Sequence, residues 1–495
     1  MPDERNPQVS EALPLVQPGW AAPLGFRRDL VLGAGSVGVA VFAASLFGIW
    51  SRPAGLLAAL WPTNALLLGM MIRYPRLAGP LSWLAAIIGY LAADLATGGH
   101  LLRTLVLTAG NLAGVITGYV LFSRVNETHR RLRDPLSILY LILIVSASAA
   151  TSGVVGAIAN PIFFHGGAAN GWILWFVTEL VNYIAILPVV LALPGFRWRG
   201  PHRRRPRVPN IALIRTMPVV ALVLSCLLGV LIAGPGAIAF PVPALLWCAV
   251  TFEMSITAAL TLLATTWTLL AISSGYLPVG PGLHSLHTML SVRMGFALIA
   301  LAPITVASVM AARNELLLRL QYMAEHDQLT GLLNRRAFTE RASALLARPS
   351  VVPRPSALLM LDIDAFKQIN DSFGHAGGDR VLTNFARIVG DCLRETSLFG
   401  RIGGEEFAIL LPDCLPDEAL AIADRVRTAF GNCVTDIEDG RQAATTVSIG
   451  IAFMPHRLAT IERPLLIADR ALYRAKATGR NRVEGMTIPF DEAVG

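Results

Sequence analysis

Residues 398–411 read LFGRIGGEEFAILL, which is two apolar runs separated by two glycines and two acids. This pattern predicts a β-hairpin, because glycine tolerates the positive φ of a tight turn. Glycine also lets a ligand approach the backbone closely. Two adjacent carboxylates, Glu405 and Glu406, follow the turn at once. An ordinary surface turn could hold such a pair, but the strand sequence around it favours a functional acid pair.

The segment upstream, residues 357–382, reads ALLMLDIDAFKQINDSFGHAGGDRVL. Its apolar start predicts a buried strand, and residues from about 376 onward predict a helix. Asp362 and Asp364 lie two residues apart at the strand end, so we expect them to project to one face of the sheet. Two carboxylates there can hold Mg²⁺, which takes oxygen ligands and shares them with substrate phosphates.

A third segment, residues 468–483, reads ADRALYRAKATGRNRV and predicts a helix that ends near Gly479. Lys476 and Arg480 are four residues apart and share one side of this helix or its C-terminal exit. Of the 41 Lys and Arg residues only two are lysines, Lys367 and Lys476. An ammonium that binds phosphate as a point charge explains both lysines, with chance as the alternative.

Together these segments resemble the GGDEF domain of diguanylate cyclases. Residues 326–338, HDQLTGLLNRRAF, are similar to the opening D-x-L-T-x-L-x-N-R element of that family, and residues 446–452, TVSIGIA, match as well. The resemblance covers residues 326–487 and implies a ferredoxin-like α/β fold with a central antiparallel sheet, similar to the palm of nucleotide polymerases and cyclases. It also implies the reaction, in which two GTP molecules condense to cyclic di-GMP and release two pyrophosphates.

The same resemblance implies a role for each matching position. Asp362, the backbone carbonyl of Ile363 and Glu405 are the implied Mg²⁺ ligands, with two ions per active half-site and Mn²⁺ able to substitute. Glu405 also matches the proton acceptor, and Glu406 matches the second acid beside metal and phosphates. The implied substrate-binding residues are the guanine pair Asn370 and Asp379, the substrate-contacting His375, the triphosphate loop Phe366 and Lys367, and the phosphate-binding Lys476 and Arg480.

One position departs from the family pattern. Family members with product inhibition carry Arg-x-x-Asp just ahead of the glycine turn, whereas this chain has Arg394 followed by Ser397 in place of the aspartate. The inhibitory site is therefore degenerate, and we predict that feedback inhibition by cyclic di-GMP is weak. Because one domain holds one nucleotide, the resemblance also implies a homodimer in which two domains face each other.

The composition predicts that a large part of the chain lies in a membrane. The 495 residues are 54% hydrophobic and only 15% charged, with a mean hydropathy of +0.57, whereas soluble domains carry about 25% charged residues. A membrane-spanning helix takes about 20 apolar residues. Ten spans are predicted, of which the eighth is short and interrupted by proline and could be re-entrant: 29–49, 54–72, 78–97, 101–123, 135–160, 171–194, 211–233, 237–252, 254–273 and 291–312.

The arginines predict the orientation of these spans in a bacterial cytoplasmic (inner) membrane. The net charge of +8 is concentrated in loops such as 124–134 and 196–207, whereas the alternate loops, such as TGGH at 97–100, contain no arginine. The positive-inside rule then places both termini in the cytoplasm. This distribution predicts contact with a lipid bilayer and argues against nucleic-acid binding. The five cysteines indicate neither disulfides nor a zinc site, and the first 28 residues lack a removable signal peptide.

Several polar residues within the predicted spans allow two interpretations. An unpaired charge there costs several kcal/mol, so these residues could form a ligand pocket or an ion path. They could instead join helices by hydrogen bonds or lie at the edge of a loop, which is the favoured interpretation for Glu253, while Asp94 and Glu179 remain open. The histidines of the outer loops could bind metal or sense pH, but they lack a paired spacing. The acids and amides concerned are Asp94, Asn111, Glu179, Asn182 and Glu253, and the histidines are His100, His165, His284 and His287.

The membrane part resembles the MASE1 integral membrane sensor domain, most clearly in LWPTNALLLGMMIRYPRLAGP at residues 60–80. This resemblance implies sensing of an unknown ligand. The junction NELLLRLQYMAEHDQ should continue the last span as a helix, and its Leu316, Leu320 and Met323 have a spacing compatible with a two-helix seam. The predicted divisions are a cytoplasmic tail (1–28), a membrane domain (29–312), a linker helix (313–325), a GGDEF domain (326–487) and a C-terminal tail (488–495).

Two alternatives to a membrane-tethered cyclase remain open. The first is a non-catalytic membrane receptor that binds GTP or cyclic di-GMP on the same fold, but the intact acids and lysine argue against a decayed site. The second is a transporter with an appended regulatory domain, which lacks the paired broken helices expected of transporters.

Overall fold

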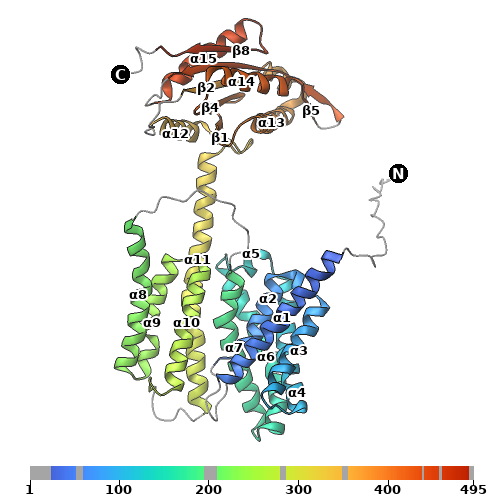
Figure 1. Ribbon diagram of the computed structural model, residues 1–495, viewed down its shortest axis with the longest axis vertical. Coiled ribbons are helices and arrows are strands. Elements are labelled where there is room, and N and C mark those ends of the chain that lie inside the picture. The colour runs from blue at the N-terminus through green and yellow to red at the C-terminus, as the bar shows by residue number, and fades with distance from the viewer. Residues whose placement is uncertain are drawn as a thin grey trace, which may run out of the picture. The chain divides into compact units, whose positions relative to one another are not determined.

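The computed structural model describes residues 24–51, 60–193, 209–278, 286–347, 355–437, 440–455 and 460–489. It divides into an N-terminal unit, Met1–Glu315, and a C-terminal unit, Leu316–Gly495 (Figure 1). Several predicted features lie wholly or mostly outside the described residues: the tail 1–28, the arginine-rich loop 196–207, His284 and the tail 488–495.

The described part of the N-terminal unit is helical throughout. Its last helix runs without interruption to Glu325, so the prediction that the junction continues the final span as a helix is confirmed. The elements are α1 (Leu24–Trp50), α2 (Thr63–Arg73), η1 (Pro75–Leu77), α3 (Pro80–Ala96), α4 (Leu101–Ser123), α5 (Glu127–Arg130), α6 (Leu136–Phe163), α7 (Ala168–Ala192), α8 (Pro209–Ile232), η2 (Pro235–Ala239), α9 (Pro241–Thr251), α10 (Met254–Ser273) and α11 (Leu286–Glu325).

Seven helices among the described residues are long and apolar enough to cross a bilayer, fewer than the ten predicted spans. Two shorter apolar segments, Pro80–Ala96 and Pro235–Thr251, cover the third and eighth predicted spans. The second predicted span is represented by α2, which begins only after Pro62, and residues 52–59 lie outside the described chain. The number of spans therefore stays a prediction.

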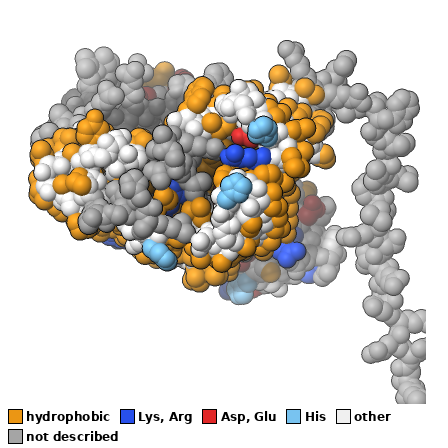
Figure 2. Space-filling model, turned by 90° about the horizontal axis from the view of Figure 1, so that it is seen from below, with side chains coloured by type: hydrophobic (Ala, Val, Ile, Leu, Met, Phe, Trp, Pro, Cys, Tyr) orange, Lys and Arg blue, Asp and Glu red, His pale blue; other side chains and the backbone are white. Residues whose placement is uncertain are grey.

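Helix α7 forms much of the core of the N-terminal unit. Its second half is buried almost continuously, and Tyr183 and Leu187 are fully enclosed. Buried residues of α2 and α6 join the same cluster. The outer faces of the helices carry large hydrophobic side chains, and Figure 2 shows hydrophobic atoms over most of the visible described surface with few charged groups among them. A surface of this kind suits a lipid environment.

The C-terminal unit is an α/β fold built on a six-stranded mixed sheet, in the order β1-β3-β4-β2-β7-β8. The four central strands are antiparallel, and β1 and β8 add parallel edges. The elements are β1 (Leu333–Asn334), α12 (Arg335–Leu346), β2 (Ser356–Ile363), α13 (Phe366–Cys392), β3 (Leu398–Arg401), β4 (Glu406–Leu411), α14 (Pro416–Gly431), β5 (Val434–Asp436), β6 (Gln442–Ala444), β7 (Val447–Met454), α15 (Glu462–Ala477) and β8 (Val483–Thr487).

Strand β2 lies in the middle of this sheet and is buried at every position. Leu359 and Leu361 pack in a core with residues of α13 and α14, whereas Leu358 and Met360 pack in a second core with residues of α12 and α15. Because alternate side chains of a strand face opposite sides, a continuous apolar run is what a strand covered on both faces needs. The predicted fold class, with its central antiparallel sheet, is confirmed.

Candidate active site

The predicted acids meet where β2 ends against the β3–β4 hairpin. Asp362 is the Cα partner of Glu406 in the antiparallel register of β2 and β4. The next residue, Ile363, donates its backbone N–H to the carbonyl oxygen of Glu405 over 3.4 Å. Residues more than 40 positions apart in sequence are thereby held side by side at one edge of the sheet.

Lys476 reaches this edge from the last turn of α15. Its Nζ lies 2.6 Å from Oδ2 of Asp362, whose side chain is almost fully buried. Burial raises the pKa of Asp362, the hydrogen bond and charge of Lys476 lower it, and the nearby carboxylates of Glu406 and Asp364 raise it further, so that the net shift is upward. The site therefore concentrates negative charge, and a single ammonium balances it in part.

Glu405 is half-buried and makes no side-chain hydrogen bond or ion pair within the described residues. Burial raises the pKa of this carboxyl, Asp362 and Glu406 raise it further, and Lys476 opposes them. A carboxylate with no partner of its own, next to a buried aspartate, is available to bind a cation or accept a proton.

Asp364 makes contacts that its spacing did not suggest. Its buried carboxylate accepts hydrogen bonds from the Thr446 hydroxyl (2.6 Å), the Ser448 hydroxyl (2.7 Å) and the Asn481 backbone N–H (3.1 Å). The expectation that both strand-end aspartates can hold Mg²⁺ stays a prediction, and for Asp364 these three hydrogen bonds compete with metal binding. They tie the end of β2 to β7 and to the segment that precedes β8.

The loop after β2 turns sharply before α13. Ala365 has a φ of 54°, a left-handed conformation that costs a non-glycine residue energy. Phe366, the next residue, is buried, whereas Lys367 is exposed. Helix α13 begins at Phe366, ten residues earlier than predicted, and Gly374 (φ 72°) interrupts it. The predicted start near 376 therefore matches only the part after this interruption.

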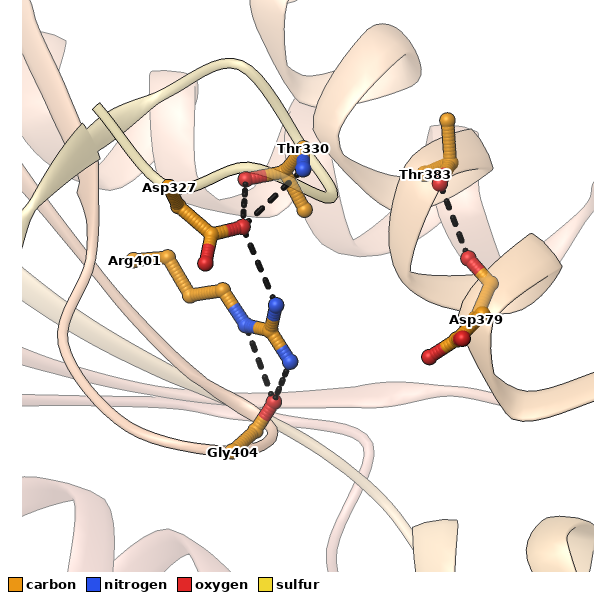
Figure 3. Close-up of polar contacts among 6 residues, drawn as sticks. All are labelled: Asp327, Thr330, Asp379, Thr383, Arg401 and Gly404. Carbon is orange, nitrogen blue, oxygen red and sulfur yellow. Dashed lines mark hydrogen bonds and ion pairs between the residues drawn. The ribbon is translucent and has the colours of Figure 1, made fainter. Parts of the chain in front are cut away.

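Asn370 and the predicted guanine partner Asp379 belong to successive parts of α13. A Cβ atom at Gly378 would lie 2.0 Å from Oδ1 of Asn370, so glycine there lets the two parts of the helix approach. Asp379 accepts a hydrogen bond from Thr383 with its backbone oxygen (2.8 Å, Figure 3), and its exposed carboxylate has no partner among the described residues. His375 is exposed.

A cavity of the C-terminal unit lies beside these residues and not at the acid pair. It measures about 560 Å³ and lies along α13 and β5. Asp379 is the one predicted site residue in its lining. Arg480 lies after the end of α15 with a φ of 58°, next to Gly479 (φ 121°), so it occupies the C-terminal exit and not the helix itself.

Arg401 and Asp327 hold the turn that carries the acid pair (Figure 3). No motif in the sequence assigned this role to either residue. Arg401 donates to the Gly404 carbonyl oxygen from Nε (3.1 Å) and Nη2 (2.6 Å), and its Nη1 lies 3.0 Å from Oδ1 of Asp327. Asp327 also accepts from the Thr330 hydroxyl (2.7 Å). The opening D-x-L-T element thus supports the hairpin. The arginine two residues before the glycine pair was the one sequence feature that could have indicated this contact.

The glycine pair serves a different purpose from the one predicted. The hairpin between β3 and β4 is confirmed, but neither Gly403 nor Gly404 has a positive φ. A Cβ atom at Gly403 would lie 2.6 Å from Oε2 of Glu406. A side chain at 403 would therefore displace the Glu406 carboxylate from its position.

The residues at the implied metal site fit Mg²⁺. Asp362, the Ile363 carbonyl and Glu405 offer only oxygen atoms, the donors that Mg²⁺ prefers, and the Lys476 ammonium marks where the site accepts positive charge. Within the described residues no group of three or more His, Cys, Asp or Glu side chains is arranged to hold a metal. Two carboxylates and a carbonyl leave the remaining positions to water and substrate phosphates, which is usual for this ion.

The polar residues of the predicted spans separate into two groups. Asp94, Asn111 and Glu179 line one cavity of the N-terminal unit, whereas Asn182 accepts a hydrogen bond from the Trp61 backbone N–H (3.1 Å) and Glu253 is exposed at the start of α10. Of the histidines in the predicted outer loops, His100, His165 and His287 are described, and all three are exposed.

Comparison with known proteins matches both units. The family described as "Diguanylate cyclase, GGDEF domain" matches residues 324–482, and MASE1 matches residues 34–314. The probable diguanylate cyclase DgcF of Escherichia coli O157:H7 is 30% identical over 441 residues, covering 87% of this chain and 89% of the relative. This chain belongs to the MASE1–GGDEF family of diguanylate cyclases.

Further relatives resemble parts of this diguanylate cyclase. The DgcF of E. coli K12 is 32% identical over 320 residues, covering 63% of this chain and 96% of the relative. The solved GGDEF domain of PA1120 from Pseudomonas aeruginosa is 39% identical, with 32% of this chain and 93% of that chain covered at a TM-score of 0.31. The GGDEF domain of this cyclase serves cyclic di-GMP synthesis, and its MASE1 domain is a membrane sensor.

Proposed function

We propose that this protein joins two GTP molecules into cyclic di-GMP and two pyrophosphates, under control of a signal received by its membrane domain. The observation that carries this proposal is the acid edge of the sheet. There the end of β2, which carries Asp362, pairs with the start of β4 next to Glu405, and the Lys476 ammonium lies 2.6 Å from Oδ2 of the aspartate. A receptor that only binds nucleotide has no need of a proton acceptor beside a metal site.

In the proposed mechanism, Asp362, the Ile363 carbonyl and Glu405 hold Mg²⁺, which when bound neutralises charge on the triphosphate and eases loss of the 3′-hydroxyl proton. Glu405 accepts that proton, and Glu406 lies beside it near the phosphates. The 3′-oxygen then forms a bond to the α-phosphorus of the second GTP, and pyrophosphate leaves. The same step in the opposite direction closes the ring.

The remaining predicted residues position the substrate. Asn370 and Asp379 bind guanine, with His375 contacting the substrate nearby. Phe366 and Lys367 form the loop at the triphosphate, assisted by Arg480. Lys476 moves from Asp362 to a phosphate oxygen when nucleotide and metal bind. Its ammonium lies 2.6 Å from Oδ2 of Asp362, a side chain that would hold the metal.

The reaction needs two domains, and α11 offers a surface for pairing them. Leu316, Leu320 and Met323, the predicted seam, are 57%, 49% and 48% exposed. Large apolar side chains exposed on one helix are suited to a second copy of that helix. We propose a homodimer in the bacterial inner membrane, with both termini in the cytoplasm and the membrane domain setting how the two GGDEF domains meet.

The test uses the full-length protein in lipid nanodiscs with GTP and Mg²⁺, and cyclic di-GMP is measured by chromatography. Glu405→Gln removes the proton acceptor and a metal ligand without changing the side-chain volume, so we expect the rate to fall about 1,000-fold or more. The matched control is Glu462→Gln, the same change at an exposed position in the first turn of α15. Its rate should equal that of the unaltered protein. An unaltered protein that binds GTP without forming product would support the receptor instead.

A further inference from the structure

The N-terminal unit contains a cavity that joins residues from four helices, α1, α3, α4 and α7, and from the segment before α2. It measures about 110 Å³, several times the space that one water needs. Asp94 from α3 and Glu179 from α7 both line it, and no Lys, Arg or His is among the described residues of its lining. These described lining residues are Ser45, Ile49, Trp61, Tyr90, Asp94, Thr104, Leu107, Thr108, Asn111, Leu174, Trp175, Thr178 and Glu179.

Glu179 is the unusual member of this lining. Its side chain is 4% exposed, and its Oε2 has no hydrogen-bond partner among the described residues. It also makes no ion pair among those residues. A buried carboxylate without a cation is costly, and more so within a membrane-spanning helix. The cavity therefore presents an acceptor that a ligand can satisfy.

The polar groups around Glu179 are fixed in place. The Tyr90 hydroxyl donates to Oδ1 of Asn64 (2.6 Å), whose Nδ2 donates to Oδ1 of Asn111 (3.1 Å). Asp94 accepts a hydrogen bond from the Thr104 hydroxyl and makes no ion pair among the described residues. Side chains held by one another in this way are suited to bind a small ligand without rearrangement.

The chemistry of the lining selects one class of ligand. Two carboxylates, with no basic side chain among the described lining residues, favour a cation over an anion or a neutral molecule. Trp61, Trp175 and Tyr90 add aromatic faces, and aromatic faces attract ammonium groups. We propose that this cavity is the sensory site of the MASE1 domain and binds a small organic ammonium ion, with Glu179 as the principal counter-ion.

The cavity is positioned to receive such a ligand from outside the cytoplasm. Asp94 lies in the last turn of α3 and Thr104 in the first turn of α4, so both lie near the short 97–100 connection. That connection is at the opposite end of the N-terminal unit from α5 (Figure 1). The arginine distribution predicts that it faces away from the cytoplasm.

One contact links the cavity to the helix that continues toward the GGDEF domain. Thr178 lines the cavity, and its hydroxyl oxygen accepts a hydrogen bond from Nη1 of Arg293 over 2.6 Å. Arg293 belongs to α11, which runs without interruption to Glu325. A ligand that moves the wall at Thr178 acts directly on α11. This regulatory part of the proposal rests on the proposed cyclase function, whereas the binding part does not.

Binding is tested with the full-length protein in nanodiscs by calorimetric titration of methyl-, ethyl-, propyl- and butylammonium chloride. The neutral probe is propan-1-ol, which matches propylammonium in size, and NaCl and KCl test inorganic cations. Glu179→Gln keeps the shape and removes the charge. Glu253→Gln is the matched control, since it makes the same change in the same unit outside the cavity. Size-exclusion chromatography and thermal unfolding check that both variants fold.

We expect at least one alkylammonium ion to bind the unaltered protein and Glu253→Gln equally, and to bind folded Glu179→Gln at least about tenfold more weakly, since a charge-assisted hydrogen bond is lost. Propan-1-ol, NaCl and KCl should produce no saturable binding. Failure of all four ammonium ions to bind, equal binding by Glu179→Gln, or equal binding of propan-1-ol, Na⁺ or K⁺ would each overturn the ammonium site.

The rate of cyclic di-GMP formation tests the link to α11. Saturation with the bound ammonium ion should change the rate at least about twofold in the unaltered protein and in Glu253→Gln, and leave Glu179→Gln unchanged. Binding without a change of rate overturns the regulatory part. A protein that makes no cyclic di-GMP but binds the ammonium ion contradicts the proposed function and leaves the binding site supported.

Discussion

Both units of this protein bury a carboxylate, but they balance its charge differently. In the C-terminal unit, Asp362 has the Lys476 ammonium 2.6 Å away. In the N-terminal unit, Glu179 is equally buried and has no cation among the described residues. In the proposed mechanism, the Lys476 ammonium moves from Asp362 to phosphate when nucleotide and metal bind. In the proposed sensory site, Glu179 is balanced by the charge of a bound ammonium ion.

The largest effect should come from removing the negative charge of Asp362. Asp362→Asn deletes a metal ligand and leaves Lys476 without its partner, so we expect cyclic di-GMP formation to fall about 1,000-fold. The unfolding temperature should change little, because burial already disfavours the charged form of Asp362.

The control for this change is Asp469→Asn, on the exposed side of the same α15 that carries Lys476. It should retain full activity. Substantial product from Asp362→Asn would mean that the strand-end aspartate is not the ligand and that its pairing with Lys476 is only structural.

At the same end of β2, Asp364 can be compared with Asp362, because its carboxylate accepts hydrogen bonds instead of pairing with a lysine. Its carboxylate accepts three hydrogen bonds, so Asp364→Asn should lower the free energy of unfolding by about 1–3 kcal/mol. Thermal unfolding measures this effect directly. A variant with unchanged stability and lost activity would indicate that Asp364 acts as a metal ligand after all.

The pKa shifts predict how the metal requirement depends on pH. The pKa values of Asp362 and Glu405 are both raised, so each carboxyl keeps its proton to a higher pH than a free carboxyl does. Protons then compete with Mg²⁺, and the half-saturating Mg²⁺ concentration should rise as the pH falls through the acid range, by up to about tenfold per unit for each proton displaced. Mg²⁺ titrations of the initial rate at several pH values measure this. A pH-independent requirement would exclude these carboxyls as ligands.

The smallest effect concerns product feedback. Arg394 is paired with Glu418 at 3.6 Å, and Ser397 cannot supply the carboxylate of the inhibitory motif. Added cyclic di-GMP should therefore change the initial rate less than twofold. Ser397→Asp, which completes the motif, should be inhibited more strongly. Strong non-competitive inhibition of the unaltered protein would contradict the prediction.

The active site was predictable from sequence to the extent that its residues are local. Glu405 and Glu406 adjoin a glycine pair, so the hairpin that carries them follows from short-range patterns, whereas the placement of Asp362 beside them was implied only by the family resemblance. The role of Asp364 was not predictable, because its donors Thr446, Ser448 and Asn481 lie more than 80 residues away in the chain. The same holds for Arg401, whose partner Asp327 is 74 residues upstream.

The N-terminal unit shows the same limit more strongly. Sequence alone could list Asp94, Asn111 and Glu179 as costly residues in apolar helices, but it could not bring them together. Their shared cavity depends on how α3, α4 and α7 pack. Sequence alone also could not fix the number of membrane spans, since hydropathy does not reveal that α2 begins only at Thr63.

The measurement that tests the central claim most directly is metal removal and restoration on the unaltered protein. Full-length protein is incubated with GTP after chelation by EDTA, and Mg²⁺ or Mn²⁺ is then added back while cyclic di-GMP is followed by mass spectrometry. We predict no product in EDTA and full recovery with either ion. Formation of cyclic di-GMP at an undiminished rate in EDTA, or none after the ions are restored, would contradict the account.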